Sequence, residues 1–327
     1  MSDTPSTSSS TSRPAPLRLG ELRKRIAPFR VKPGAQVRLP ADFDPGYTNH
    51  YVKKSDAAEA LADGVSQLGE YQARLAAQNI HGVVVVLQAM DAAGKDGTVK
   101  HVFSGVNPQG VTVHSFKVPS PQELQHDYLW RFSMALPQRG SIGIFNRSHY
   151  EEVLVVRVHP ENLDNEHLPP SAMKQPDVWN RRYREINDWE RYLVDNGIRV
   201  VKLFLNVSKK EQAKRLLARI EESDKNWKFD VRDTLERDRW DDYQRAYEQM
   251  LGATSTRYAP WHVVPADHKW FARLAASWII LETLMDIDPQ YPNVDPETRE
   301  QMQVLKAKLE AEIGAKAAQA SDDPPPA

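Results

Sequence analysis

The sequence has no cysteine among its 327 residues, which excludes disulfide bridges, thiolate metal sites and cysteine-based catalysis. It also has no long hydrophobic run. The stretch before residue 17 lacks the apolar segment of a signal peptide, and no later segment approaches the length of a membrane-spanning helix. These absences fit a reducing compartment, so we expect a cytoplasmic protein that has no membrane partner.

The sequence also lacks a large excess of charge of either sign, since it has 43 Lys and Arg residues and 44 Asp and Glu residues. A chain so close to neutral holds a polyanion only through a local basic patch. We find no platform of aromatic and basic residues that would bind a nucleic acid, so we expect no nucleic-acid partner. What is present is the composition of a globular protein, with 40% hydrophobic and 27% charged residues.

The two ends of the chain differ in composition from the rest. Residues 1–16 are rich in Ser, Thr and Pro, and the residues after about 315 are rich in Ala and finish in Asp and Pro. Such segments bury too little apolar surface to fold, so we predict disorder in both. We place one domain over residues 17–300, followed at 301–327 by the end of a helix and a disordered tail.

Between these ends, short apolar runs alternate with helical patterns. The apolar runs predict buried strands, one beginning at Val83 and the others at residues 111–116, 141–145, 198–207 and 261–266. Helices are predicted at residues 121–136, at residues 177–196 before Gly197, and after Ser208, which is a typical N-cap. This alternation predicts an α/β fold, with a mostly parallel sheet and helices on both of its faces.

The segment from Val83 to Thr98 has the order strand, small-residue turn and helix N-terminus, which is typical of a phosphate-binding loop. Its backbone N–H groups and the helix dipole favour phosphate. The residues that we expect to bind phosphate here are Ala93, Gly94, Lys95, Asp96, Gly97 and Thr98. The pattern departs from the usual one at Ala89, where a glycine is common, and at Asp96, where a metal-binding hydroxyl is common. Alanine is tolerable at the first position if its φ is negative.

Asp91 is the misfit in this loop. A carboxylate among phosphate-binding N–H groups repels the ligand unless a cation lies between them. The simplest resolution is Mg²⁺, with Mn²⁺ as a substitute, held by Asp91 against phosphate oxygens. This favours a phosphotransferase. The alternative is an ordinary corner between strand and helix, in which Asp91 caps the helix. Asp96 is either a second metal ligand or, as we favour, an acid stabilised by the helix dipole.

Arg147 follows another predicted strand. Because ligands of parallel sheets bind at the carboxyl ends of the strands, we expect residues 146–148, the loop after Val83 and residues 265–269 on one rim. A guanidinium group there can clamp a transferring phosphoryl group through two hydrogen bonds. A structural ion pair is the alternative role for this arginine.

Six ordered segments carry a family resemblance. They read LQAMDAAGKDGTVKHVFSGVNPQGV, FNRSHYEEVL, YREINDWE, KNWKFDVRD, ERDRWDDYQRAYE and APWHVVPADHKWFARL. Over roughly residues 28–290 the chain resembles polyphosphate kinase family 2. The resemblance implies a P-loop nucleotide-kinase-like fold with a helical lid, here at about residues 208–240. It also implies a homo-oligomer that moves phosphoryl groups between inorganic polyphosphate and nucleotides with Mg²⁺.

The resemblance also implies roles for single residues. Asp91 would be the metal ligand that orients the attacking acceptor phosphate, with Lys95 and Arg147 beside it as catalytic residues. Further phosphate contacts are implied for Lys100 and, in the lid, for Lys228 and Arg232. Lys100 taken alone would be a solvated surface lysine, which stays as the alternative.

The order from Asn146 to Glu151 resembles the class of the family that accepts both nucleoside monophosphates and diphosphates. The nucleotide contacts expected here are Asn146, Arg147, His149 and Glu151. Glu151 would accept a hydrogen bond from an amino group of the base. A purely structural role for His149 and a surface position for Glu151 are the alternatives.

We therefore predict a Mg²⁺-dependent phosphotransferase whose partners are inorganic polyphosphate and nucleotides. AMP and ADP are the expected acceptors, with GMP and GDP as further candidates. Two other functions stay open. One is an ATP-dependent nucleoside monophosphate kinase, which the fold alone would support. The other is a non-catalytic module that binds nucleotide or polyphosphate and regulates a partner.

Overall fold

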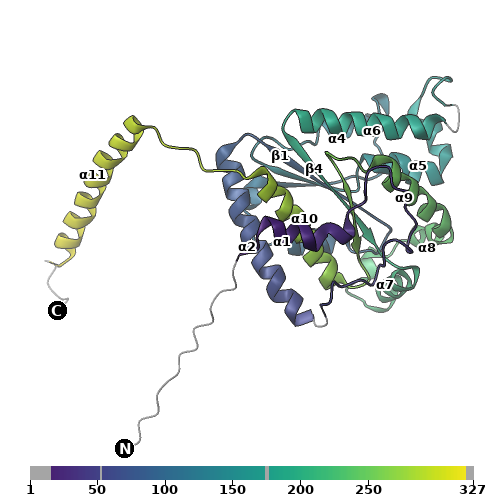
Figure 1. Cartoon of the computed structure of the whole chain (residues 1–327), viewed down its shortest axis with the longest axis horizontal. Helices are drawn as coiled ribbons and strands as arrows, with labels where there is room; N and C mark the ends of the chain where they lie inside the picture. Colours follow the sequence, from purple (N-terminus) through teal and green to yellow (C-terminus); the bar gives the residue numbers. More distant parts are fainter. Residues whose placement is uncertain (1–15, 52–53, 174–176, 322–327) are drawn as a thin grey trace, which may run out of the picture. The chain divides into compact units, whose positions relative to one another are not determined.

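The structure, a computed structural model, describes residues 16–51, 54–173 and 177–321. The chain divides into two compact units, Met1–Gln290 and Tyr291–Ala327. The larger unit holds the sheet, and the smaller one contains α11 (Pro296–Ser321) (Figure 1). This division comes before the predicted domain end at residue 300, and α11 extends into the tail that we predicted to be disordered. The disorder predicted for residues 1–15 lies outside the described residues.

In the described part of the chain, five parallel strands form one sheet in the order β2-β3-β1-β4-β5. The strands are β1 (Gly82–Ala89), β2 (Val111–Ser115), β3 (Ile142–Asn146), β4 (Ile198–Asn206) and β5 (Trp261–Pro265). Each overlaps the strand predicted from its apolar run. Every residue of β1 is buried, as expected for a central strand with both faces covered. The predicted parallel sheet is confirmed.

Helices connect the strands and cover them. The α-helices of the larger unit are α1 (Leu19–Ile26), α2 (Lys54–Gln78), α3 (Lys95–Val102), α4 (Trp130–Ser133), α5 (Val155–Val158), α6 (Asp177–Asp195), α7 (Lys209–Glu221), α8 (Val231–Asp238), α9 (Trp240–Thr254) and α10 (Lys269–Ile287). The 3₁₀ helices are η1 (Ala27–Phe29), η2 (Pro108–Gly110), η3 (Glu123–Gln125), η4 (His149–Val153), η5 (Pro160–Glu166) and η6 (Asn226–Lys228). Among the described residues, none of the helices has the length and apolar composition to cross a bilayer.

Two groups of helices bury the sheet. One group centres on α10, which packs against β4 and β5 and also against α1, α2 and α3 (Figure 1). The other centres on α6, which packs against β4 and α9. Phe204 of β4 stacks on Tyr247 of α9 with ring centroids 4.3 Å apart, so this second group covers the face of β4 that carries Phe204.

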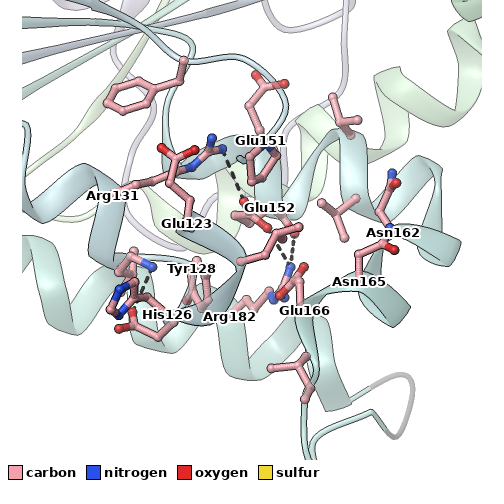
Figure 2. Close-up of a pocket in the computed structure, with 18 of the residues that line it drawn as sticks. Glu123, His126, Tyr128, Arg131, Glu151, Glu152, Asn162, Asn165, Glu166 and Arg182 are labelled. Atoms are coloured by element: carbon pink, nitrogen blue, oxygen red, sulfur yellow. Dashed lines mark hydrogen bonds and ion pairs between the residues drawn. The ribbon is translucent and has the colours of Figure 1, made fainter. Parts of the chain in front are cut away.

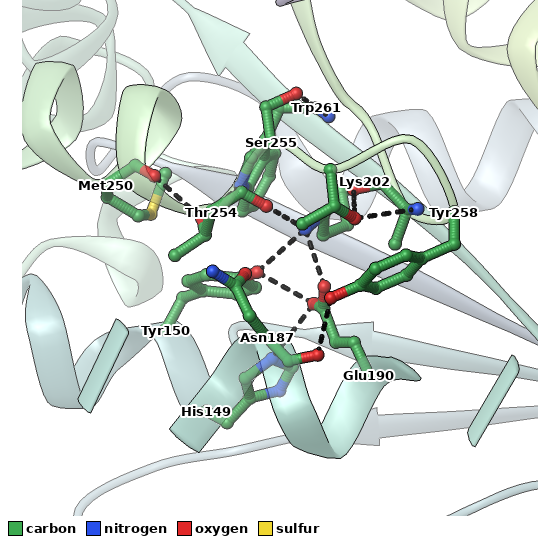
Figure 3. A network of polar contacts seen from close by, with 12 residues as sticks. His149, Tyr150, Asn187, Glu190, Lys202, Met250, Thr254, Ser255, Tyr258 and Trp261 are labelled. Carbon is green, nitrogen blue, oxygen red and sulfur yellow. Dashed lines mark hydrogen bonds and ion pairs between the residues drawn. The ribbon is translucent and has the colours of Figure 1, made fainter. Parts of the chain in front are cut away.

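A buried charged network joins α6 to β4 (Figure 3). The Lys202 ammonium group of β4 donates to Glu190 Oε2 at 2.7 Å, to the Tyr150 hydroxyl at 2.9 Å and to the Thr254 carbonyl at 2.7 Å. Lys202 and Glu190 both have 0% exposed surface. Burial alone would raise the pKa of Glu190, but Lys202 and His149 together outweigh burial and lower that pKa. A paired charge therefore fixes the helix on the strand.

The prediction of one helix over residues 121–136 is wrong. Within that range the chain forms η3 and α4, and between them His126 is extended, with φ −116° and ψ 170°. A local hydrogen bond explains the break: Asp127 accepts the N–H of Leu129 at 2.9 Å and starts a new turn, whereas Ser120 and Glu123 cap the start of η3. Such bonds from side chain to backbone compete with a continuous helix.

Candidate functional site

The loop after β1 has the geometry of a phosphate-binding loop. β1 ends at Ala89, and α3 begins at Lys95 directly after Gly94, whose φ of 110° is left-handed. Ala92 is also left-handed, with φ 62°. Ala89 is a strand residue, so an alanine in place of the usual first glycine meets no backbone conflict. The left-handed residues of this loop, Ala92 and Gly94, follow Ala89 in the sequence.

Asp91 and Arg147 form an ion pair beside this loop, with Arg147 Nη2 2.8 Å from Asp91 Oδ1. The Arg147 backbone is left-handed at φ 63°, and its N–H donates to the Leu87 carbonyl of β1 at 3.1 Å. Its Nη1 lies 3.8 Å from Glu151 Oε2. Burial opposes the charge of Arg147, but the carboxylates of Glu151 and Asp91 outweigh burial and raise its pKa. The guanidinium group is therefore held charged at the ends of β1 and β3.

The other predicted residues of the rim are close by. Lys95 Nζ donates to the Ala89 carbonyl at 2.9 Å, and Asn146 Nδ2 donates to Asp96 Oδ1 at 2.9 Å. Burial lowers the pKa of Lys95, while the charge of Asp91 opposes that shift. The structure thus brings the loops after β1 and β3 together, as the strand order predicts.

A cavity of about 1030 Å³, here named the phosphate-loop cavity, opens over this loop. It is lined by residues 91–98 together with Asn146 and Arg147. The lining also includes cations from α7, α8, α10 and nearby residues, namely Lys214, Arg215, Arg219, Lys225, Lys228, Arg232, Lys269 and Arg273, and the acids Glu211, Glu222, Asp230, Asp233 and Glu236. This is the local basic patch that a nearly neutral chain needs to hold a polyanion. Of the residues predicted to bind phosphate, Lys100 is the one outside the lining, and it is exposed on α3.

The predicted lid, residues 208–240, consists of α7, η6 and α8. Its cations at the cavity each have a local partner. Arg219 Nη1 lies 2.5 Å from Asp233 Oδ2, and Arg232 Nη2 lies 2.8 Å from Asp230 Oδ2. The Lys228 ammonium group lies 4.9 Å from the centroid of the Trp227 ring. Lys228 and Arg232 therefore stand at the cavity, as predicted, on exposed side chains.

Sequence reasoning missed two residues of α7 that hold the loop. Arg215 donates to four backbone carbonyls: those of Ala92 at 3.3 Å and Ala93 at 2.7 Å, and, after β5, those of Ala266 at 2.6 Å and Asp267 at 3.0 Å. Gln212 Nε2 donates to the Asp91 carbonyl at 3.1 Å. Both side chains are buried. Their partners are backbone carbonyls, so no pattern of residue types along the sequence indicates these contacts.

A second cavity, of about 480 Å³ and here named the apolar cavity, adjoins the first (Figure 2). The two cavities share Phe116, Lys117, Val118, Arg147 and Val155. The apolar side chains that line it include Phe116, Leu124, Leu129, Val155, Val156 and Leu168. Glu151, predicted to contact the base, lies in this wall next to Arg147. Arg147 therefore stands between an apolar space and a cationic one.

Glu152 is a second carboxylate of the apolar cavity (Figure 2). Its Oε2 lies 3.3 Å from Arg182 Nη1, and its Oε1 lies 3.8 Å from Arg131 Nη2. Arg182 also pairs with Glu166. Burial, followed by the charge of Glu166, raises the pKa of Glu152 to about 7, although the two arginines oppose the shift. A carboxylate in this wall thus titrates near neutral pH.

His149 does not reach either cavity. Its side chain has 0% exposed surface, and its Nε2 lies 3.5 Å from Glu190 Oε1 in the network of Figure 3. Burial lowers the pKa of His149. The reason is local: Ser148 caps η4, which begins at His149, and the three consecutive side chains of Ser148, His149 and Tyr150 are buried in the core. His149 is therefore removed from the predicted nucleotide contacts, and the structural alternative is the one that the geometry supports.

Comparison with protein families matches residues 51–292 to the family described as polyphosphate kinase 2. The chain belongs to the polyphosphate kinase 2 family. The matched region ends close to the division between the two units of the chain.

Named relatives and a solved structure agree with this membership. The ADP-polyphosphate phosphotransferase of Rhodopseudomonas palustris is 49% identical over 284 residues, which cover 86% of this chain and 97% of the relative. The AMP/ADP-polyphosphate phosphotransferase of Meiothermus ruber is 46% identical over 279 residues, covering 85% and 99%. The crystal structure of polyphosphate kinase 2 from Arthrobacter aurescens TC1 matches with a TM-score of 0.76 and 39% identity, covering 85% of this chain and 95% of that one. The P-loop kinase-like fold is confirmed.

Proposed function

We propose that this member of the polyphosphate kinase 2 family transfers phosphoryl groups between inorganic polyphosphate and nucleoside monophosphates and diphosphates, with AMP and ADP as the first acceptors. One observation carries the proposal: Arg147 lines two adjoining cavities and lies 2.8 Å from Asp91 at the phosphate loop. One cavity is rich in cations and the other is apolar. Two substrates, a phosphate chain and a nucleotide with a flat base, would meet at this pair.

The charges of the phosphate-loop cavity suit a polyphosphate chain. Lys214, Lys269 and Arg273 extend the cationic lining beyond the loop itself. Burial and the neighbouring cations, first Arg215 and then Lys225, lower the pKa of Lys269. Basic side chains outnumber acidic ones in the lining of this cavity. A bound polyanion would relieve this repulsion, which favours binding of a long chain of phosphates over a single one.

The apolar cavity suits a nucleoside. Its volume of about 480 Å³ falls within the range of about 300–1,000 Å³ that is typical of small-molecule sites. Phe116 offers a ring and Glu151 offers a hydrogen-bond acceptor for the amino group of adenine. The name of the relative from Meiothermus ruber, which includes both AMP and ADP, supports acceptance of both nucleotides.

Mg²⁺ fits the residues at the loop. This ion prefers oxygen ligands, keeps several waters, and is commonly bound by one or two carboxylates together with substrate phosphates. Asp91 supplies such a carboxylate in the lining of the phosphate-loop cavity, and Asn146 supplies an amide oxygen nearby. When bound, the ion would neutralise charge on the phosphates of donor and acceptor. Mn²⁺ has the same preference for oxygen ligands.

The chain's own residues supply position and charge. The N–H groups of residues 94–97 cradle phosphate, and Lys95 and Arg147 stabilise the charge on the group in transit. Asp91 orients the acceptor phosphate for attack in line with the leaving oxygen. Such a transfer needs little covalent help, so positioning and charge neutralisation suffice. Closure of the predicted lid, with Lys228 and Arg232, would exclude water and prevent hydrolysis of the donor.

The test supplies AMP or ADP with Mg²⁺ and inorganic polyphosphate, in the absence of any other nucleotide. Formation of ADP from AMP, and of ATP from ADP, supports the proposal. Transfer that occurs only after ATP is added would indicate a nucleoside monophosphate kinase instead. Binding without transfer under either condition would indicate a regulatory module. Chromatography separates the nucleotides, and ADP with Mg²⁺ but without AMP or polyphosphate is the control for adenylate kinase activity, which forms ATP and AMP from two ADP.

A further inference from the structure

Side chains of α7 hold three consecutive peptide units of the phosphate loop. Gln212 Nε2 donates to the Asp91 carbonyl at 3.1 Å, and Arg215 Nη1 donates to the carbonyls of Ala92 at 3.3 Å and Ala93 at 2.7 Å. A trans peptide unit is planar, and its N–H points opposite to its C=O. Holding these carbonyls toward α7 therefore fixes the direction of the N–H groups that follow them. It also holds Ala92 at a φ of 62°, a conformation that L-residues rarely adopt.

Gln212 is bonded on its other side to α8 of the predicted lid. Arg237 Nη1 donates to Gln212 Oε1 at 2.7 Å and to the Lys209 carbonyl at 2.9 Å. The two contacts of Gln212 are complementary, because its amine faces a carbonyl and its oxygen faces a guanidinium group. Turning the amide over would set like against like at both ends. The partners therefore require one orientation of this side chain.

The position of Gln212 separates it from the residues that would touch substrate. Its side chain is 1% exposed, and it lines neither the phosphate-loop cavity nor the apolar cavity. α8 itself lies within electrostatic reach of the loop. Burial, and after it the charge of Asp91, raises the pKa of Asp233 on α8. Gln212 is thus a buried bridge from α8 to the backbone of Asp91.

We propose that Gln212 is a positioning residue that links α8 of the predicted lid to the peptide planes of the phosphate loop. When α8 is in place, Arg237 holds the Gln212 oxygen and the Gln212 amine holds the Asp91 carbonyl. When α8 moves away, Gln212 loses the partner that orients it, and the loop loses one of its three carbonyl contacts. The loop is then fully ordered for transfer only while α8 is in place. This inference rests on the proposed phosphotransfer.

The test uses the full chain with three variants. Gln212→Glu keeps the size of the side chain and an acceptor for Arg237, but it sets an oxygen against the Asp91 carbonyl. Arg237→Gln removes the guanidinium group on the α8 side and leaves the contact with Asp91. Arg245→Gln is the matched control on α9, because it removes an arginine that pairs with Asp242 and has no part in this link. Initial rates with ADP, Mg²⁺ and polyphosphate give kcat and KM separately.

We expect Gln212→Glu to lower kcat by about 10- to 100-fold, since small misplacements of binding groups cost up to about 10²-fold in rate. Arg237→Gln should lower kcat by a smaller factor. The double variant should be no slower than Gln212→Glu alone, because both changes act on one connection. KM for polyphosphate should change much less than kcat, and Arg245→Gln should match the unchanged protein.

Losses that multiply in the double variant would overturn the proposal, as would an unchanged kcat in Arg237→Gln. The same holds if kcat falls in each variant only in step with its melting temperature, since that is the mark of a merely structural role. If Gln212→Glu does not fold, Arg237→Gln decides alone: its kcat must fall while its melting temperature stays within the range of the Arg245→Gln control. An unchanged protein that transfers nothing from polyphosphate would contradict the proposed function itself, which is a different result from a failure of the link.

Discussion

Asp91 is the residue on which the proposed chemistry depends most. It is a carboxylate among groups that favour phosphate, and Arg147, 2.8 Å away, compensates its charge. The pair is partly open to solvent, with 30% of the Asp91 side chain and 40% of the Arg147 side chain exposed, so it contributes little to the stability of the fold. Charged groups that contribute little to the stability of the fold, yet lie together in a cleft, are common at functional sites.

Asp91→Asn removes this charge while keeping the size of the side chain. We expect kcat to fall by at least about 100-fold, because loss of one electrostatic contact with a transition state costs about 10²–10³ in rate. The melting temperature should stay nearly unchanged. Initial rates of ATP formation and a thermal melt check both points. Asp96→Asn on the same loop should lose less, since an amide oxygen can still accept the Asn146 hydrogen bond. Nearly full activity in Asp91→Asn would remove Asp91 from the chemistry.

Glu152 gives the protein a pH-dependent stability. Its folded pKa of about 7 lies above the ordinary value of 4.5, so the folded state binds the proton more tightly than the unfolded state does. The stability from this group is complete below about pH 4.5 and is lost as pH rises toward 7. Glu152→Gln cannot titrate. We therefore expect the melting temperature of Glu152→Gln, relative to the unchanged protein, to increase from pH 5 to pH 8, and a constant difference would contradict the raised pKa.

The sequence predicts part of this site and misses another part for a physical reason. Asp91, Lys95 and Arg147 follow strands or open a helix, and such places can be recognised from local patterns. Gln212 and Arg215 donate hydrogen bonds to backbone carbonyls of distant segments. Every residue has a backbone carbonyl, so the residue types along the sequence do not indicate which ones are bound. For His149 the motif predicts a nucleotide contact, whereas the side chain is buried at the start of η4, which favours the structural alternative.

Among the elements, the strands were predictable and one helix was not. In runs such as VVVV at residues 83–86, the side chains on both faces of the strand are buried. This pattern is typical of central strands in parallel sheets. The segment at 121–136 has a helical composition, yet it is divided where Asp127 accepts the backbone N–H of Leu129. Competition of this kind depends on side-chain rotamers, which composition does not show.

The contact between α6 and β4 allows a test of a buried ion pair. Lys202→Met leaves the Glu190 carboxylate buried without its partner, so we expect a loss of about 3–5 kcal/mol in the free energy of unfolding. The double variant Lys202→Met with Glu190→Leu removes both charges and should recover much of that loss. Urea unfolding, analysed with one slope for all variants, measures both effects.

The same helix offers the control for this experiment. Arg191 and Asp188 of α6 form a pair at 3.0 Å in which both side chains are exposed. Arg191→Gln should change the free energy of unfolding by less than about 1 kcal/mol, as is usual for surface pairs. If Lys202→Met were no more destabilised than Arg191→Gln, the network of Figure 3 would not hold α6 on β4.

At the scale of the whole molecule, the chain separates into two units after Gln290, and the family match ends at residue 292. The described core residues reach as far as Ile287, at the end of α10. α11 differs from α10 in its surface: Leu309 of α11 is 56% exposed, whereas Leu284 of α10 has 0% exposed surface. The predicted domain end at residue 300 lies beyond the division after Gln290, because helical patterns continue past Gln290 although the described buried residues do not.

This difference predicts the result of removing residues 291–327. A chain that ends at Gln290 keeps all of the described core, so its melting temperature should stay within about 2 °C, which corresponds to less than about 1 kcal/mol for a domain of this size. Two point variants calibrate the measurement. Leu284→Ala should cost about 2–5 kcal/mol through a cavity in the core, whereas Leu309→Ala should stay within about 0.5 kcal/mol. If the shortened chain melted as early as Leu284→Ala, the larger unit would depend on the smaller one for its stability, and the division after Gln290 would not mark an independently stable body.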